Sequence, residues 1–281
     1  VVRTSVPGLA SSGTVSFVAG PGRVVIRPLD FVAGYAVPDD GAARTLTAAL
    51  AAHGPLWPGP REGTVWLPGK GRIGKVDLVR LDGGRVEDSL PLPRRMSWPT
   101  LYSDRAGYLF ANTKDGSFDI GPSGARPIPG TPVAAGPRRL LTRECEKDGR
   151  CHLTVIDRKS RAERALSEGP RLQIFRGGRP PFGVTPISPD GETAPLLVGG
   201  GSTYRKLHLL DLETGAEHPT DVRVPSHSDT LAWSPDSRWL FVATTDGDLL
   251  AINRQTGNGH RILPGLSHIM QVAFTAQQPD D

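Results

Sequence analysis

The polar residues of this chain that could perform chemistry do not occur at the spacings that catalysis needs. The closest match to the Gly-x-Ser-x-Gly nucleophile pattern of serine hydrolases is Gly200-Gly-Ser-Thr-Tyr204, which lacks the last glycine and falls in an expected hairpin loop. The seven histidines occur singly rather than at metal-ligand spacing. The sequence therefore predicts no catalytic constellation, no metal site and no cofactor.

Two arrangements keep catalysis open as an alternative. His227-Ser-Asp229 precedes Trp233, and a loop that enters an innermost strand can face a central channel. We favour the simpler interpretation, in which Asp229 or Ser226 caps a turn. The other arrangement is a set of carboxylates that could converge on such a channel from separate loops, namely Asp104, Asp190, Asp236 and Asp246.

One segment rich in arginine and phenylalanine is the candidate binding site. Its residues alternate in a stretch with many Gly and Pro, and they are Arg171, Phe175, Arg176, Arg179 and Phe182. Loops often carry recognition, and the planar fork of arginine suits carboxylates and phosphates. A strand followed by a rigid crossing loop is the simpler interpretation and the one we favour, so binding here is a hypothesis.

The only two cysteines, Cys145 and Cys151, bracket the five residues of an expected hairpin loop. Opposed residues in such a hairpin have Cβ atoms about 4.5–5.5 Å apart, so a disulfide needs little backbone adjustment. Two free thiols are the alternative. A metal site is disfavoured because only His152 lies nearby. We expect the disulfide, and with it an extracytoplasmic location, because disulfides persist in oxidising compartments.

These residues are positioned by a repeated pattern of about 45 residues. Ile187-Ser-Pro-Asp-Gly191 runs on to a segment ending at Gly215, and Trp233-Ser-Pro-Asp-Ser237 runs on to one ending at Gly257. Short strands alternate with turn residues in both copies, as in a propeller blade. The later copy predicts strands over 231–233, 239–243, 249–253 and 259–263. The earlier copy predicts strands over 193–198, 204–212 and 217–222.

Weaker copies of the pattern occur upstream. They begin near Val15, Leu56, Leu101 and Val133. Another begins at Met270 and is not completed, while Trp57 is expected at the position that Trp233 occupies in its copy. Six units are recognisable. A seventh could lie between Val133 and Ile187 or be assembled from both ends of the chain.

The sequence therefore predicts an all-β fold, a β-propeller with six or seven four-stranded blades. We expect the N- and C-terminal strands to pair and close the ring, because closure hides strand edges. The 281 residues form one expected domain, 1–281, since the repeat continues without a linker. Thr45–Ala52 could be a short helix or an outer strand, and both remain open.

The blades resemble those of bacterial WD40-like propellers of the TolB type, the PD40 repeat. The resemblance rests on Ser-Pro-Asp-Gly before a strand and Leu-Leu-Asp-Leu-Glu-Thr-Gly after it, and it covers Ile187–Leu263. Upstream, Ser103-Asp104 and Gly136-Pro137 stand in for the motif. The Trp-Asp and Gly-His pairs of eukaryotic WD40 blades are missing. The resemblance implies an extracytoplasmic or periplasmic binding platform, although such propellers also form the non-catalytic half of oligopeptidases.

Charge and hydropathy limit the partners. The formal net charge is +4, but arginine is spread through most repeats, so no nucleic-acid partner is expected. No apolar run reaches the length of a membrane span. The chain begins without Met, which leaves an upstream signal or anchor open. Its preference for Arg over Lys, with much Ala, Gly and Pro, is typical of an actinobacterial-like, GC-rich genome.

The predicted function is an extracytoplasmic binding or scaffolding propeller that recognises a protein or peptide and is monomeric without it. The absence of a catalytic constellation favours a non-enzymatic role. Two alternatives remain, an enzyme with acidic residues lining the channel and the sensor domain of a membrane-anchored protein.

Overall fold

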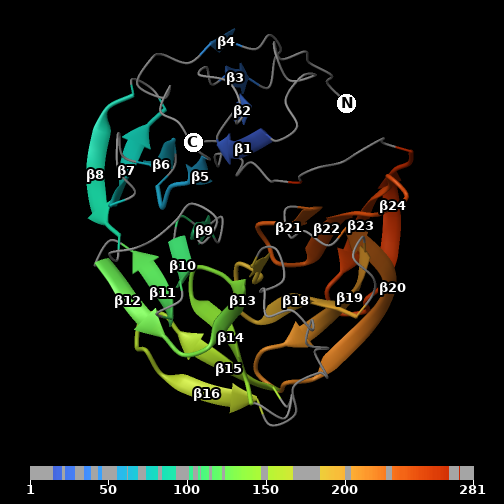
Figure 1. The fold of residues 1–281 in the computed structure, drawn as a ribbon. Helices are drawn as coiled ribbons and strands as arrows, with labels where there is room; N and C mark the ends of the chain where they lie inside the picture. Colours follow the sequence, from blue (N-terminus) through green and yellow to red (C-terminus); the bar gives the residue numbers. More distant parts are fainter. Residues whose placement is uncertain are drawn as a thin grey trace. The chain divides into compact units, whose positions relative to one another are not determined.

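The regular elements of this protein are short β-strands, β1 to β24 (Figure 1). The computed structural model describes residues 15–20, 23–28, 35–38, 44–45, 56–61, 63–68, 74–81, 84–92, 101–103, 107, 109–113, 116–121, 124–146, 151–166, 184–199, 204–225, 230–265 and 272. Within these ranges, no helix is long and apolar enough to cross a membrane.

The chain forms two compact units, whose boundary falls between Pro127 and Ile128 at the end of β12. The first unit contains three sheets of four consecutive antiparallel strands, which we call blades 1, 2 and 3. Their strands are β1 (Val15–Gly20), β2 (Arg23–Pro28), β3 (Tyr35–Pro38), β4 (Arg44–Thr45), β5 (Trp57–Pro58), β6 (Thr64–Pro68), β7 (Lys75–Arg80), β8 (Val86–Pro91), β9 (Leu101–Ser103), β10 (Leu109–Thr113), β11 (Gly116–Gly121) and β12 (Gly124–Ile128).

The second unit contains three sheets of five, three and four strands, which we call blades 4, 5 and 6. Their strands are β13 (Thr131–Ala135), β14 (Arg139–Cys145), β15 (Cys151–Asp157), β16 (Glu163–Leu166), β17 (Thr185–Pro186), β18 (Thr193–Val198), β19 (Tyr204–Asp211), β20 (Glu217–Pro225), β21 (Leu231–Trp233), β22 (Trp239–Ala243), β23 (Leu249–Asn253) and β24 (Gly259–Leu263). The single domain over 1–281 stays a prediction.

Blades 5 and 6 confirm the strands predicted from the two clear repeats. All four strands of blade 6 have the predicted bounds, and β18 does as well. Asp246-Gly247 forms the hairpin between β22 and β23, where Gly247 has a φ of +82°. Glycine adopts this left-handed conformation without the steric cost that a Cβ would impose. The turn residues therefore fix where each strand ends.

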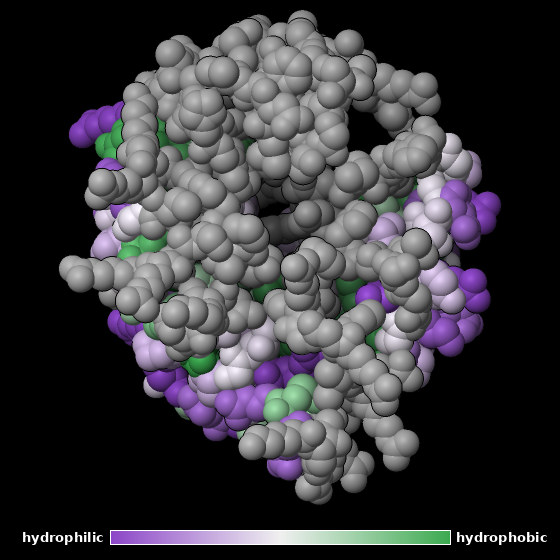
Figure 2. Space-filling view, viewed as in Figure 1, coloured by the Kyte–Doolittle hydropathy of each residue, from purple (hydrophilic) through white to green (hydrophobic). Residues whose placement is uncertain are grey.

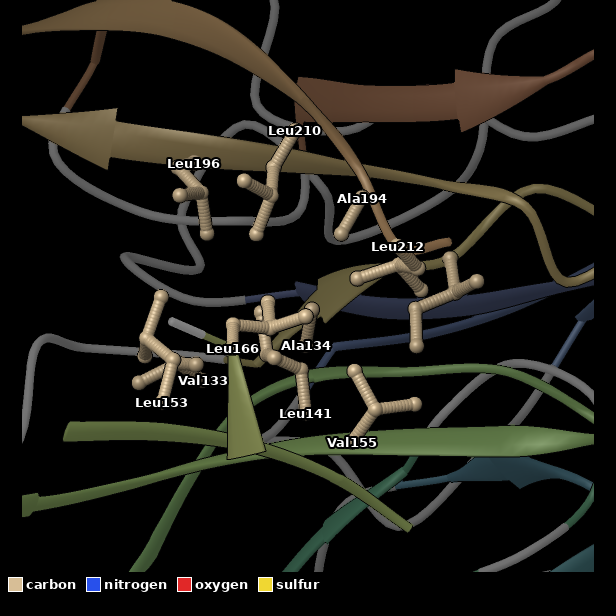
Figure 3. Close-up of a cluster of buried hydrophobic side chains, with 11 residues drawn as sticks. Val133, Ala134, Leu141, Leu153, Val155, Leu166, Ala194, Leu196, Leu210 and Leu212 are labelled. Carbon is tan, nitrogen blue, oxygen red and sulfur yellow. The ribbon is translucent and has the colours of Figure 1, made fainter. Parts of the chain in front are cut away.

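Neighbouring blades pack their flat faces together through apolar side chains. A cluster between blades 4 and 5 is shown in Figure 3, and a second cluster joins blades 5 and 6. In the first unit, Trp66 of blade 2 packs with Leu109 and Ile120 of blade 3. Each fully buried Leu, Ile or Val contributes about 1.5–3 kcal/mol to folding. The packing of one blade on the next is thus the main source of stability within each unit.

β17 stands where the first strand of blade 5 is expected, but it is hydrogen-bonded to blade 4. β17 pairs in parallel with β13 of blade 4, and β18, β19 and β20 form a sheet of three strands without it. In blade 6, Ala232 of the first strand opposes Phe241 of the second. The same register in blade 5 would place Pro186 opposite Pro195. Neither proline has an N–H group, so the two hydrogen bonds normally exchanged there cannot form.

Side chains and the neighbouring blade replace these missing bonds. The Thr185 hydroxyl donates to the Pro195 carbonyl oxygen at 2.6 Å and lies 3.2 Å from that of Val133. The Ile187 N–H donates to the Ala135 carbonyl oxygen of β13 at 2.8 Å. The chain therefore holds β17 between the two blades.

The described residues contain six sheets, and those between Val133 and Ile187 form only blade 4 and β17. Trp57 is one position away from its expected place, because it opposes the third residue of β6 whereas Trp233 opposes the second residue of β22. The closing segment 270–274, apart from Val272, lies outside the described residues, as do positions 46–52 after β4.

Candidate functional site

Each blade of the second unit has two ends with different roles. Because consecutive strands run antiparallel, the turns after the first and third strands lie at one end, which we call the turn end. The end of the second strand, the start of the third and the end of the fourth lie at the opposite end, which we call the hairpin end. The fourth strands, such as β16 and β24, expose mostly polar side chains, which are purple in Figure 2.

At the turn end, the Ser-Pro-Asp motif is a structural cap. The Ser188 hydroxyl donates to Asp190 Oδ1 at 2.6 Å and accepts the Thr193 N–H at 2.9 Å. Ser234 makes the same two bonds in blade 6, to Asp236 and from the Trp239 N–H. The carboxylate therefore orders its own turn.

The hydrogen bonds of these caps stabilise the ionised carboxylates. Burial raises the pKa of Asp190, but bonds from Ser188 and the Glu192 N–H, with the charge of Arg254, outweigh it and leave this pKa below its usual range. Bonds from the Ser234 hydroxyl and the Arg238 N–H lower the pKa of Asp236. Both groups are suited to remain ionised, which is opposite to what a general acid requires.

The turn after the third strand is a second cap repeated in three blades. Asp157, Asp211 and Asn253 each accept two backbone N–H bonds from the residues two and three positions later, at 2.7–3.1 Å. These bonds lower the pKa of Asp157. The side chains thus terminate strands, a role that asparagine and aspartate share.

Ion pairs join neighbouring blades at the turn end. Arg254 of blade 6 contacts both Asp190 and, at 3.1 Å, Glu192 of blade 5. Arg139 and Arg164 of blade 4 lie 3.4 and 3.6 Å from Glu213 of blade 5. Asp190, Glu192 and Glu213 are therefore occupied by structural contacts.

The acidic residues considered for a channel do not gather in one place within the second unit. Asp190 and Asp236 lie at the turn end, whereas Asp246 lies in the β22–β23 turn at the hairpin end. Asp104, like 227–229 and Gly200, lies outside the described residues. Across the described ranges, no group of three His, Cys, Asp or Glu side chains could hold a metal ion.

The predicted disulfide is present at the hairpin end of blade 4. Cys145 ends β14 and directly opposes Cys151, the first residue of β15. Next to it, Glu146 and His152 lie 3.1 Å apart and are 52% and 61% exposed. The bond closes the hairpin on an accessible surface.

The structure describes the residues on either side of the proposed binding segment. Its residues Arg171, Phe175, Arg176, Arg179 and Phe182 lie outside the described residues. Before the segment, Leu166 ends β16 opposite Leu153, two residues after the disulfide. After it, Thr185 begins β17 opposite Ala134. The segment therefore leaves blade 4 from the hairpin end.

Sequence reasoning missed a group of cations at the same end. Arg143 on β14, Lys206 on β19 and Arg223 on β20 make no ion pair with any described carboxylate. The guanidinium carbon of Arg223 lies 5.2 Å from the centroid of the Tyr204 ring. In the sequence, these three cations resemble the other dispersed basic residues. Only the strand register shows that Arg143, Lys206 and Arg223 belong to the same interface between blades.

Known structures agree with the arrangement of the strands. The β-propeller domain of Cps50 (Swd1) from Myceliophteria thermophila is 12% identical with a TM-score of 0.51, covering 90% of this chain and 87% of that one. Streptogramin B lyase is 14% identical with a TM-score of 0.55, covering 94% and 87%. TolB from Acinetobacter baumannii is 14% identical with a TM-score of 0.47, covering 89% and 63%.

No protein-family model and no curated protein matches the sequence. The relation to the PD40 repeat therefore stays a prediction. At identities this low, likeness to solved structures establishes the fold alone. Together with the succession of antiparallel blades, the first two of these structures show that this chain has the β-propeller fold.

Proposed function

We propose that this protein is an extracytoplasmic propeller that binds a protein or peptide partner at the hairpin end of blades 4 and 5. The observation that carries the proposal is the contrast between the two ends of these blades. At the turn end, Asp190, Glu192 and Glu213 are engaged in caps and ion pairs with cations of the neighbouring blade, whereas the hairpin end presents a disulfide-closed hairpin and cations without a described counter-charge. A surface with unused binding capacity is the better candidate for recognition.

The disulfide supports the extracytoplasmic part of the proposal. Structural disulfides persist in secreted or periplasmic proteins and are rare where thiols are kept reduced. Cys145 is exposed, so a reducing compartment would have access to the bond. The propeller would then act outside the cytoplasm as a single domain, monomeric without its partner and with no nucleic-acid ligand.

The segment with Arg171, Arg176 and Arg179 is the proposed partner-binding loop. The strand before it, β16, ends at Leu166, which opposes Leu153, two residues after Cys151 of the disulfide hairpin. Arginine forks form paired hydrogen bonds with carboxylates, and Phe175 and Phe182 would add apolar contact area.

Affinity capture tests the proposal. The immobilised protein is incubated with the extracytoplasmic fraction of the cells that produce it, and bound proteins are quantified by mass spectrometry. We compare wild type with R171A/R176A/R179A and with the control R85A/R126A/K159A, whose three cations are exposed elsewhere. Truncating buried interfacial charges costs about 2–5 kcal/mol, so the first variant should retain less than about a tenth of the partner.

The control variant should retain the partner at the wild-type level. Equal losses in both variants would show that only the total charge matters. The proposal is wrong if the wild type captures no protein reproducibly from the extracytoplasmic fraction.

A further inference from the structure

The apolar interface between blades 4 and 5 ends differently at its two ends. Its centre is the cluster of Figure 3, in which Leu141 and Val155 of blade 4 pack with Leu196 and Leu210 of blade 5. At the turn end, cations from blade 4 meet Glu213 of blade 5. At the hairpin end, cations come from both blades.

Arg143 lies on the face of blade 4 that is turned toward blade 5. It directly opposes Leu153 on β15, and opposed residues share a face of the sheet. Leu153 belongs to the interface cluster, as does Leu141, which is two residues before Arg143 on the same strand. Arg143 is thus the next side chain after the apolar ones, two residues before Cys145.

Lys206 and Arg223 lie on the face of blade 5 that is turned toward blade 4. Lys206 opposes Val198 on β18 and Arg223 on β20. Val198 packs against the same interface cluster. Tyr204, beneath Arg223, adds an aromatic ring at the start of β19. Lys206 lies near the start of β19 and Arg223 lies opposite it near the end of β20. Both side chains are therefore at the hairpin end, as Arg143 is.

None of the three cations has a described counter-charge, and one of them, Arg143, is partly buried. Arg143 is half-buried, and desolvation lowers the pKa of its guanidinium. None of the described carboxylates forms an ion pair with Arg143, Lys206 or Arg223. A half-buried cation without a partner is costly, and like charges at one interface repel each other. An anionic ligand would remove both costs.

We propose that Arg143, Lys206 and Arg223 bind the carboxylates of an acidic segment in a partner protein. This inference deepens the proposed function and rests on it for the identity of the ligand as a protein. Apolar Val198 and the Tyr204 ring lie beside the cations, so an extended segment that mixes Asp or Glu with apolar side chains matches the surface. A bare polyanion would use only the charges.

Fluorescence anisotropy with defined probes tests the inference. The probe is a short labelled peptide of alternating Glu and Leu, and its control has Lys in place of Glu. Wild type should bind the acidic peptide and not the basic one. The variant R143Q/K206Q/R223Q should bind it at least about tenfold more weakly. The matched variant R85Q/R126Q/K159Q loses the same charge from exposed sites elsewhere and should change the affinity less than about twofold.

Two additions keep the test decisive. Because Arg143 is half-buried, K206Q/R223Q changes only exposed side chains and should still weaken binding if the triple variant does not fold. Inorganic polyphosphate and oligo(dT) serve as bare polyanions. If either binds more tightly than the acidic peptide, or if the matched variant loses as much affinity as R143Q/K206Q/R223Q, the inference is overturned.

Failure of the inference can be told apart from failure of the proposed function. If R143Q/K206Q/R223Q still captures the wild-type partner from the extracytoplasmic fraction, the site is wrong and the binding function stands. If no partner is captured but the acidic peptide binds with the expected dependence on the three cations, the cation site stands and the proposed function fails.

Discussion

The backbone N–H of Asp190 donates a hydrogen bond to the Ser237 hydroxyl of the next blade, 3.0 Å away. Both residues belong to the Ser-Pro-Asp turns, so the turn of one blade is bonded to the corresponding turn of the next. Ser237 is buried and has a φ of +62°, a conformation that costs an L-residue about 1–2 kcal/mol. Serine at this position is therefore explained by its hydroxyl and not by its backbone preference.

Substitutions of Ser237 separate the hydroxyl from the backbone strain. S237A keeps the positive φ and leaves the Asp190 N–H without its acceptor, which should lower the free energy of unfolding by about 1–3 kcal/mol. S237G also removes the acceptor but relieves the strain, so it should be about 1 kcal/mol more stable than S237A. Urea denaturation of the three proteins checks this. Wild-type stability in S237A would show that the hydrogen bond contributes nothing.

The aspartate caps make the free energy of unfolding depend on pH in the acidic range. The pKa values of Asp190 and Asp211 are lowered in the folded protein, because hydrogen bonds and cations outweigh the effect of burial. Such groups stabilise the fold above their unfolded pKa of about 3.9, and this contribution is lost as the pH falls through the folded value. Unfolding free energy should therefore decrease below about pH 5.

The variant D190N/D211N should flatten this decrease. Asparagine already occupies the cap of blade 6 as Asn253 and accepts the same two backbone bonds, so the Asp211 turn is expected to persist. Urea denaturation at several pH values measures the slope. An unchanged slope in the variant would mean that other carboxylates control acid unfolding.

Thr185 should be essential for holding β17 between blades 4 and 5. T185V keeps the shape but removes the hydroxyl that reaches the Pro195 carbonyl oxygen in a buried position. Leaving that group unsatisfied should cost about 1–3 kcal/mol in thermal or urea unfolding. T245V is the control in an exposed turn and should stay within about 0.5 kcal/mol of wild type. Equal stability of T185V and T245V would contradict this role.

The disulfide can be tested without knowledge of any partner. Closing a loop as short as that between Cys145 and Cys151 should stabilise the fold by about 2 kcal/mol. C145S/C151S should be less stable by this amount and should no longer respond to dithiothreitol. Thiol titration of the denatured, unreduced protein should find no free thiol. Two free thiols would remove the basis for an extracytoplasmic location.

The sequence was most informative where turn residues and strand spacing are local. The bounds of β21 to β24 follow from Pro235-Asp236, Asp246-Gly247 and Thr256-Gly257, because such residues determine the turn and the turn determines where strands end. The disulfide follows from the same logic, since a five-residue loop places its flanking cysteines opposite each other.

Features that depend on distant neighbours could not be predicted in this way. The predicted equivalence of Trp57 and Trp233 was wrong by one residue. Each tryptophan precedes a turn in the sequence, and only the strand register shows which position of the blade it occupies. Pro186 and Pro195 each suggest a turn or an edge, and only their opposition explains the displaced strand. That Arg143 forms no ion pair with a described carboxylate likewise depends on which side chains surround it in space.

The transfer of β17 to blade 4 limits how this array of sheets can be divided. A cut in the chain between β16 and β17 would separate a strand from the sheet that supplies its main-chain bonds. We therefore expect blades 4 and 5 to unfold as one cooperative unit, and hydrogen exchange should report a shared protection level for their central amides. An engineer who transplants or permutes this protein would have to move the two sheets together.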